Sequence, residues 1–128
     1  MSKFVLDAYA WVEYLEGSKA GLKVREIILD KSNTIYTNSV TVAEVISRTK
    51  RKNMDIKIAL NAIGSLSIII NIDFSLANEV GLLHADIRKT IKDFGLADAF
   101  VLLTARKLNA KILTGDPHFK GFKETIII

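Results

Sequence analysis

Apolar positions in this chain fall into short runs separated by polar turns, and the spacing within the runs is of two kinds. Spacing of three or four residues predicts helices over 8–16, 19–29, 41–51, 56–65, 75–91 and 97–108. Short runs rich in β-branched residues predict strands over 3–6, 34–37, 67–72, 111–114 and 125–128. The chain therefore alternates strands with helices.

These strands do not alternate apolar with polar positions, which is the pattern of a strand buried on both sides. Strands of this kind, connected by helices, predict an α/β fold in which a parallel sheet is covered on both faces. In such sheets the ligand site lies beyond the carboxyl ends of the strands, near the point where the strand order reverses. That edge is where candidate functional residues are to be sought.

Composition is that of an ordinary globular domain, with 49% hydrophobic and 25% charged residues in a chain of 128. We expect one domain over 1–128 with a single core, because this length is near the commonest domain size. The absence of cysteine excludes disulfides, thiolate catalysis and cysteine-based zinc sites. The first twenty residues lack the apolar block of a signal peptide, and we expect a soluble cytoplasmic protein.

Positive charge is in modest excess, with a net charge of +4 and a pI near 9.4. The cations gather near two predicted helix ends, at Arg48, Lys50, Arg51 and Lys52, and again at Arg88, Lys89 and Lys92. Two interpretations fit them: cations are favoured at the carboxyl end of a helix dipole, or they contact nucleic-acid phosphates.

Four acids lie close to the predicted carboxyl edge of the sheet. Asp7 directly follows the first strand, and Asp116 follows the fourth by two residues. Glu44 is expected in the first turn of the helix after the second strand, and Asp98 opens the helix before the fourth strand. Each also has a structural interpretation: Asp7 as a helix N-cap, Glu44 in a capping box over 41–44, Asp98 at a helix dipole, and Asp116 in a turn before proline.

These separate structural roles do not explain why the acids gather at one edge of a basic protein. Two carboxylates about 4 Å apart repel each other by about 4 kcal/mol at an effective dielectric constant of 20, so a cluster requires protons or a cation. With no cysteine, and no histidine near Asp7, Glu44 or Asp98 in the sequence, the donors favour Mg²⁺ or Mn²⁺ over zinc. Such a site suits hydrolysis of phosphate esters.

Three segments, "DAYAWVEYL", "AEVISR" and "LADAFVLLTARKLNAKILTGDPHF", together resemble a PIN domain of the VapC type, the toxin half of VapBC toxin–antitoxin pairs. The third segment is the most specific, since it combines an acid, a buried helix, a strand and a Thr-Gly-Asp turn. Matched by position, the family's acidic quartet falls on Asp7, Glu44, Asp98 and Asp116, and its hydroxyl residue on Thr114.

The resemblance implies a three-layer sandwich with a central five-stranded parallel sheet, usually in a homodimer. It also implies endonucleolytic cleavage of RNA by water with Mg²⁺ or Mn²⁺ held by the quartet, which Thr114 assists. A partner antitoxin of the VapB type is expected to block the acidic pocket with its tail. A housekeeping ribonuclease and an inactive RNA-binding PIN scaffold are the alternatives within the same fold.

A receiver-like signalling domain is the alternative from another class, with Asp73 after the third strand as its phosphoacceptor. That chemistry requires a pair of acids after the first strand, where "LDA" offers only Asp7. Asp73 is otherwise expected to cap the following helix.

Five further residues are assigned no catalytic role. His118 could meet an RNA phosphate or lie in a plain turn, and Asp93 could join the outer shell of the site or be solvated. Ser39 could be a site hydroxyl or a local cap. Trp11 and Phe100 fit the core better than a base-stacking surface.

Overall fold

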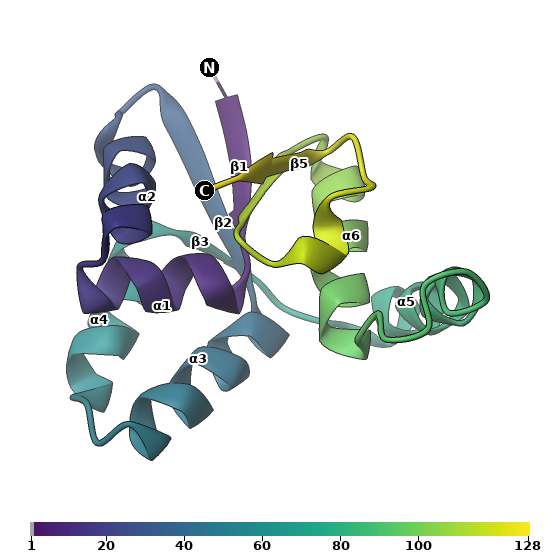
Figure 1. Ribbon diagram of the computed structural model, residues 1–128, viewed down its shortest axis with the longest axis horizontal. Coiled ribbons are helices and arrows are strands. Elements are labelled where there is room, and N and C mark those ends of the chain that lie inside the picture. The colour runs from purple at the N-terminus through teal and green to yellow at the C-terminus, as the bar shows by residue number, and fades with distance from the viewer. Residues whose placement is uncertain (1) are drawn as a thin grey trace.

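The structure, a computed structural model, describes residues 2–128 and contains a five-stranded, all-parallel sheet (Figure 1). The strands are β1 (Ser2–Leu6), β2 (Asn33–Asn38), β3 (Ile68–Ile70), β4 (Lys111–Thr114) and β5 (Thr125–Ile127). Their order in the sheet is β3-β2-β1-β4-β5, so the chain extends to one side from β1 and to the other from β4. The strand order therefore reverses between β1 and β4, whose carboxyl ends lie side by side through the pairing of Leu6 with Leu113.

Six α-helices flank the sheet: α1 (Ala8–Glu16), α2 (Lys19–Leu29), α3 (Ser39–Arg51), α4 (Ile56–Leu66), α5 (Phe74–Ile87) and α6 (Leu96–Leu108). Successive residues of β1 belong to two different cores, because Leu6 packs with Trp11 and Val24, whereas Val5 packs with Leu102 and Ala105. This alternation along the strand places α1 to α4 on one side of the sheet and α5 and α6 on the other (Figure 1). The predicted α/β sandwich is confirmed.

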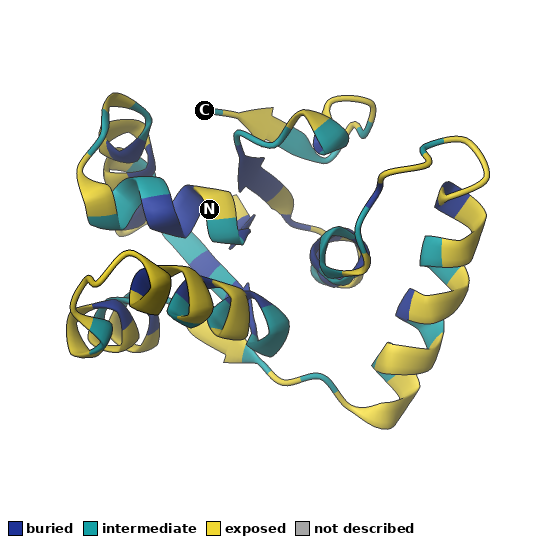
Figure 2. Ribbon diagram, turned by 60° about the horizontal axis from the view of Figure 1, so that its bottom comes forward, coloured by how far each residue is buried: buried dark blue, intermediate teal, exposed yellow. Residues whose placement is uncertain are grey.

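Helix α6 is the central element of its layer. It contacts β1, β2 and β4 on one side and α5 on the other. Its buried residues include Val101, Leu102 and Thr104, as expected from a sequence that is apolar nearly all round. Helix α5 is the outermost element, and most of its ribbon is exposed in Figure 2.

Two predicted elements are shorter than expected. The helix predicted over 75–91 ends at Ile87, because the backbone N–H and the hydroxyl of Thr90 both donate to the Ile87 carbonyl and turn the chain. The strand predicted over 67–72 is limited to Ile68–Ile70, since Ser67 is held by hydrogen bonds to the Ile63 carbonyl at the end of α4. Neither change moves the residues at the carboxyl edge.

The helices of residues 2–128 are short. The longest, α5, has 14 residues, whereas a membrane span requires about 20. None of the helices in this part of the chain combines the length and the apolar character needed to cross a membrane.

Candidate active site

Asp7 is buried at the junction of β1 and α1. It is the N-cap of α1, and its Oδ1 accepts a hydrogen bond of 2.9 Å from the backbone N–H of Ala10. Its Oδ2 accepts a hydrogen bond from the Thr114 hydroxyl at the end of β4. Burial raises the pKa of Asp7 to about 7 against the two hydrogen bonds, and the charges of Asp116 and Asp98 add to the rise.

Thr114 connects the two strands at which the sheet order reverses. Its side chain is fully buried, and its Oγ1 donates to Asp7 while accepting 2.9 Å from the backbone N–H of Asp116. Asp116 in turn caps the short 3₁₀ helix Pro117–Phe119, where it accepts 2.9 Å from the N–H of His118. One hydroxyl therefore fixes both the Asp7 carboxylate and the turn that presents Asp116.

Asp98 reaches the same edge from the first turn of α6. Its Oδ2 accepts a hydrogen bond of 3.2 Å from the backbone N–H of Gly95, which precedes the helix. Burial raises the pKa of Asp98, and the negative charge of Asp116 raises it further. The cation of His118 acts in the opposite direction.

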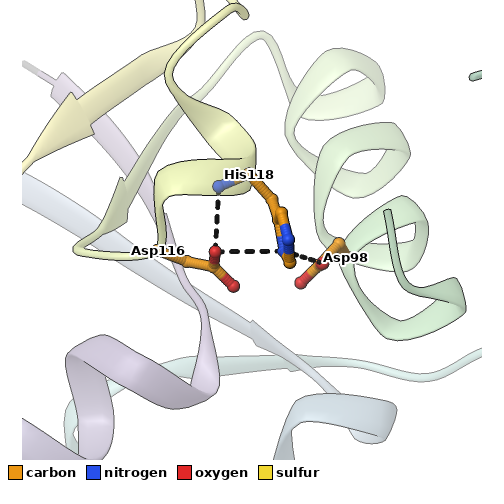
Figure 3. Close-up of side chains that lie close together, drawn as sticks. All are labelled: Asp98, Asp116 and His118. Atoms are coloured by element: carbon orange, nitrogen blue, oxygen red, sulfur yellow. Dashed lines mark hydrogen bonds and ion pairs between the residues drawn. The ribbon is translucent and has the colours of Figure 1, made fainter. Parts of the chain in front are cut away.

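His118 faces both acids, as Figure 3 shows. Its Nδ1 lies 3.2 Å from Asp116 Oδ1 and 3.5 Å from Asp98 Oδ2. Its Nε2 lies 3.0 Å from Asp93 Oδ2, and this hydrogen bond is the main cause that raises the pKa of His118. Within residues 2–128 the buried Nδ1 atom has no hydrogen-bond partner of good geometry. His118 is therefore close to Asp98 in space, although no histidine is near Asp98 in the sequence.

Glu44 faces this group from α3, which contacts α6. Desolvation raises the pKa of Glu44, the charges of Asp98 and Asp116 raise it further, and Arg48 lowers it. The capping box expected over 41–44 is wrong, as is the first-turn position. Helix α3 begins at Ser39, where the side chain of Asn38 is the N-cap and accepts 2.8 Å from Thr41 N–H. Glu44 has no capping task, so its position at the site is not explained by helix formation.

A cation could be held where the donors converge. Among the described residues 2–128, one group of three side chains, Asp98, Asp116 and His118, offers donor atoms within 4.8 Å of one another. Asp7 and Glu44 lie outside that group but share its field, since each has its pKa raised by Asp98 and Asp116. The donors and their mutual repulsion fit a divalent ion.

A metal-binding histidine typically donates its second ring N–H to a carboxylate, which fixes the tautomer. The Nε2 contact with Asp93 has that form and leaves Nδ1 directed at the two acids. Sequence reasoning missed this role because the contact joins residues 25 positions apart. The only signal was the closeness of His118 to Asp116 in the chain.

We refer to Asp7, Glu44, Asp98 and Asp116 as the acid group. The other residues considered in the sequence analysis have structural roles outside it. Trp11 is buried, and its Nε1 donates 3.0 Å to the Thr37 hydroxyl. Phe100 packs against the core between the sheet and α5. Ser39 accepts 3.3 Å from the N–H of Ile72, a structural contact that joins the start of α3 to the segment after β3. Asp73 caps α5 as expected, accepting 2.8 Å from a backbone N–H after the edge strand β3.

Comparisons with known proteins identify the family and the fold. The sequence model of the PIN domain matches residues 4–124. No curated protein sequence matches the chain. One similar solved structure is Mycobacterium tuberculosis VapC20, described as a toxin that cleaves the sarcin-ricin loop; its TM-score is 0.76 at 13% identity, over 94% of this chain and 95% of that one.

Two further similar structures are complexes. VapBC2 of Rickettsia felis, bound to a DNA fragment from its promoter, has a TM-score of 0.71 at 20% identity, over 98% of this chain and 97% of that one. DNA-bound VapBC of Salmonella typhimurium has a TM-score of 0.72 at 18% identity, over 100% and 98%. At these identities the likeness shows a common fold.

Proposed function

This chain belongs to the PIN domain family, and from that premise we propose that it is a metal-dependent endoribonuclease that hydrolyses phosphodiester bonds of RNA. We take residues 1–128 to be a single PIN domain. The observation that carries the proposal is the set of acids at the strand-order reversal. The charges of Asp98 and Asp116 raise the pKa of Asp7 and of Glu44, and the charge of Asp116 raises the pKa of Asp98. Structural capping alone would not require them to share one field.

The chain's own residues divide the task. Asp98 and Asp116, with His118, would hold Mg²⁺ or Mn²⁺, because their donor atoms already converge. An ion bound there supplies Lewis-acid activation of water and neutralises charge on the phosphate. Asp7 and Glu44 would lie beside the ion and orient water by hydrogen bonding, and Thr114 positions Asp7.

Asp7 is also suited to proton transfer. A pKa of about 7 lets its carboxyl take up or release a proton near neutral pH. Bound cation would lower that pKa, because a nearby positive charge favours the ionised form. The hydrogen bond from Thr114 holds the Asp7 carboxylate in one orientation.

Asp98→Asn tests the assignment, since it keeps the size of the side chain and removes the charge. With Mn²⁺ and single-stranded RNA, cleavage by the folded variant should fall at least a hundredfold, in the range that removal of one charge-stabilising group costs, about 10²–10³. Asp73→Asn, which alters an exposed cap of α5, should retain the parent rate. Cleavage by Asp98→Asn at the parent rate would show that the site is elsewhere.

A second measurement separates a nuclease from an inactive scaffold. Mn²⁺ at a hundred times its Kd should raise the free energy of unfolding of the parent protein by about 2.7 kcal/mol. Asp98→Asn should respond much less at the same concentration. If the parent showed no stabilisation by Mn²⁺ or Mg²⁺, the divalent-ion requirement would be wrong.

We further propose that the protein is the toxin of a VapBC pair, acting as a homodimer that a VapB-type antitoxin inhibits. Two of the similar structures are VapBC assemblies. The test is co-expression with the product of any adjacent short reading frame, followed by size-exclusion chromatography and an RNA-cleavage assay. A stable complex with suppressed cleavage is expected, and a free, fully active chain would favour a housekeeping ribonuclease.

A further inference from the structure

A surface hollow of about 440 Å³ opens beside the acid group, between the start of α1 and the outer face of α3. Its lining residues are Ala8, Ala43, Glu44, Ser47, Arg48 and Arg51. We refer to it as the α3 hollow. Ligand-binding pockets have about 300–1,000 Å³, so its size suits a group such as one nucleotide. Glu44 belongs to both the acidic site and the hollow, so the two are continuous.

The polar lining of the hollow changes from acidic to basic along one face of α3. Glu44, Ser47, Arg48 and Arg51 are spaced i, i+3, i+4 and i+7, which places them on the same side of a helix. At a rise of 1.5 Å per residue, Arg48 and Arg51 lie about 6 and about 10 Å farther along the helix axis than Glu44. A chain leaving the acids along this face would meet the two arginines in succession.

Both guanidinium groups are available. Within the part of the chain that the structure describes, residues 2–128, the ion pairs do not involve Arg48 or Arg51. Arg51 uses its Nε in a long hydrogen bond of 3.4 Å to the Ser47 carbonyl, which leaves its terminal nitrogens free. Lys52, by contrast, pairs with Glu16 across α1 and α3. A helix-dipole role alone would not place the unpaired cations in a hollow that leads to the acids.

We propose that the α3 hollow binds the phosphodiester backbone of single-stranded RNA next to the cleaved bond, with Arg48 and Arg51 contacting successive phosphates and Ser47 donating a hydrogen bond. This inference rests on the proposed nuclease function. Guanidinium groups match phosphate oxygens in bidentate geometry. The lining contains no aromatic residue on which a base could stack. Binding at the hollow is therefore insensitive to base sequence.

The hollow also answers an electrostatic difficulty of the site. Asp7, Glu44, Asp98 and Asp116 repel an RNA phosphate as they repel one another. Cations immediately beside the acids draw the flanking phosphates in, and so they offset the repulsion on the scissile one. Arg48 and Arg51 are therefore positioning residues, which should affect RNA affinity and KM more than kcat.

The experiment measures binding separately from cleavage. A fluorescein-labelled 12-mer of oligoadenylate is titrated with the full chain in EDTA, by anisotropy, over a range of KCl concentrations. Arg48→Gln/Arg51→Gln should weaken binding about a hundredfold, at about tenfold per lost charge-assisted contact. The slope of log K against log salt should become shallower by about 1.4, at about 0.7 per phosphate contact on a single strand.

The matched control removes the same charge from the opposite edge of the sheet. Lys3 and Lys111 are exposed near the amino ends of β1 and β4, and Lys3→Gln/Lys111→Gln should leave affinity and slope nearly unchanged. Arg51→Lys should bind better than Arg51→Gln, because it keeps a charge. With Mg²⁺, the arginine variant should show raised KM with kcat within about threefold of the parent.

Several outcomes would overturn the proposal. If the arginine variant binds RNA with the same affinity and the same salt slope as the parent, and the parent cleaves RNA, the proposed role of the hollow is wrong while the nuclease function stands. An equal loss in the lysine control would show a general charge effect. Hexaglutamate is a competitor that tests another ligand. If it displaces the labelled RNA as strongly as unlabelled oligoadenylate does, and if this depends on the same arginines, the hollow binds an acidic protein segment instead. A parent that neither binds nor cleaves the RNA would reject the proposed function itself.

Discussion

Asp7→Asn should make the metal-free protein more stable at alkaline pH, although it disturbs a buried hydrogen bond. The folded state raises the pKa of Asp7 from 3.8 to about 7, a difference of about 3 units, or about 4 kcal/mol at ~1.4 kcal/mol per unit. Because the pKa of Asp7 is higher in the folded state, the contribution of this carboxyl to the free energy of unfolding is fully present below about pH 4. It is lost as the pH rises through about 7. Between pH 5 and pH 8 this one carboxyl costs the parent protein about 3 kcal/mol.

Asparagine carries no charge and avoids the full loss, which at pH 8 is about 4 kcal/mol. Its Oδ1 can still accept from the N–H of Ala10, but its Nδ2 cannot accept from Thr114, which costs about 1 kcal/mol. At pH 8 we therefore expect a net stabilisation of about 3 kcal/mol in EDTA. Urea unfolding followed by fluorescence of Trp11, the single tryptophan and a buried one, measures it. Parallel pH profiles for the parent and the variant would refute the reasoning, and Asp73→Asn, at an exposed cap, should follow the parent.

Three further predictions address the site and the packing around it. Thr114→Val removes the hydroxyl that favours the ionised Asp7. The pKa of Asp7 should therefore rise above about 7, and the loss of stability with pH should extend to higher pH in the same urea titrations. Thr114→Ser keeps a hydroxyl and should restore the parent profile. His118→Ala should weaken Mn²⁺ binding in calorimetry by at least the roughly 10- to 100-fold that the loss of an outer-shell partner costs. An unchanged Kd would remove His118 from the donors. Gly21→Ala should destabilise the protein by about 3 kcal/mol or more, since a Cβ there would overlap the backbone carbonyl of Glu13 in α1. Gly64→Ala is the control, because its Cβ would meet open space within a helix, and it should stabilise by about 0.5–1 kcal/mol in thermal denaturation.

The strand pattern predicted the sheet well because the strands are short runs rich in apolar or β-branched residues. The central strands β1 and β4 end in buried positions, whereas the isoleucines of the edge strands β3 and β5 are largely exposed. Helix ends were harder to predict from the sequence, since they depend on single side chains. Asn38, rather than Thr41, begins α3, and Thr90 ends the turn after α5. A polar residue near a helix end has several partners within reach, and the sequence does not show which one packing leaves free. That choice explains the misplaced capping box at Glu44.

The sequence predicted that these acids lie near one another, because strand ends in a parallel sheet converge on one edge; their role at the site stays a prediction. Their pKa shifts could not be predicted in the same way, because the largest contribution to the raised pKa of Asp7, Glu44 and Asp98 is burial, which the sequence does not specify. His118 was missed for a related reason. His118 lies in a short 3₁₀ helix after β4, and it contacts Asp93 in the loop before α6 and Asp98 in the first turn of α6. No sequence pattern fixes how the two segments face each other.

The structural and functional interpretations of these acids are not alternatives. Asp7, Asp98 and Asp116 each accept a hydrogen bond from a backbone N–H at the start of a helical turn, where unpaired N–H groups favour negative charge. The caps hold the carboxylates near one another despite their repulsion. Burial is the main cause that raises the pKa of Asp7 and Asp98, and the negative charge of Asp116 adds to the rise in both. Asparagine keeps the accepting oxygen and loses the charge, whereas alanine loses both. Asparagine at Asp98 should therefore abolish ion binding with little loss of stability, while Asp98→Ala should also destabilise α6 by about 1 kcal/mol.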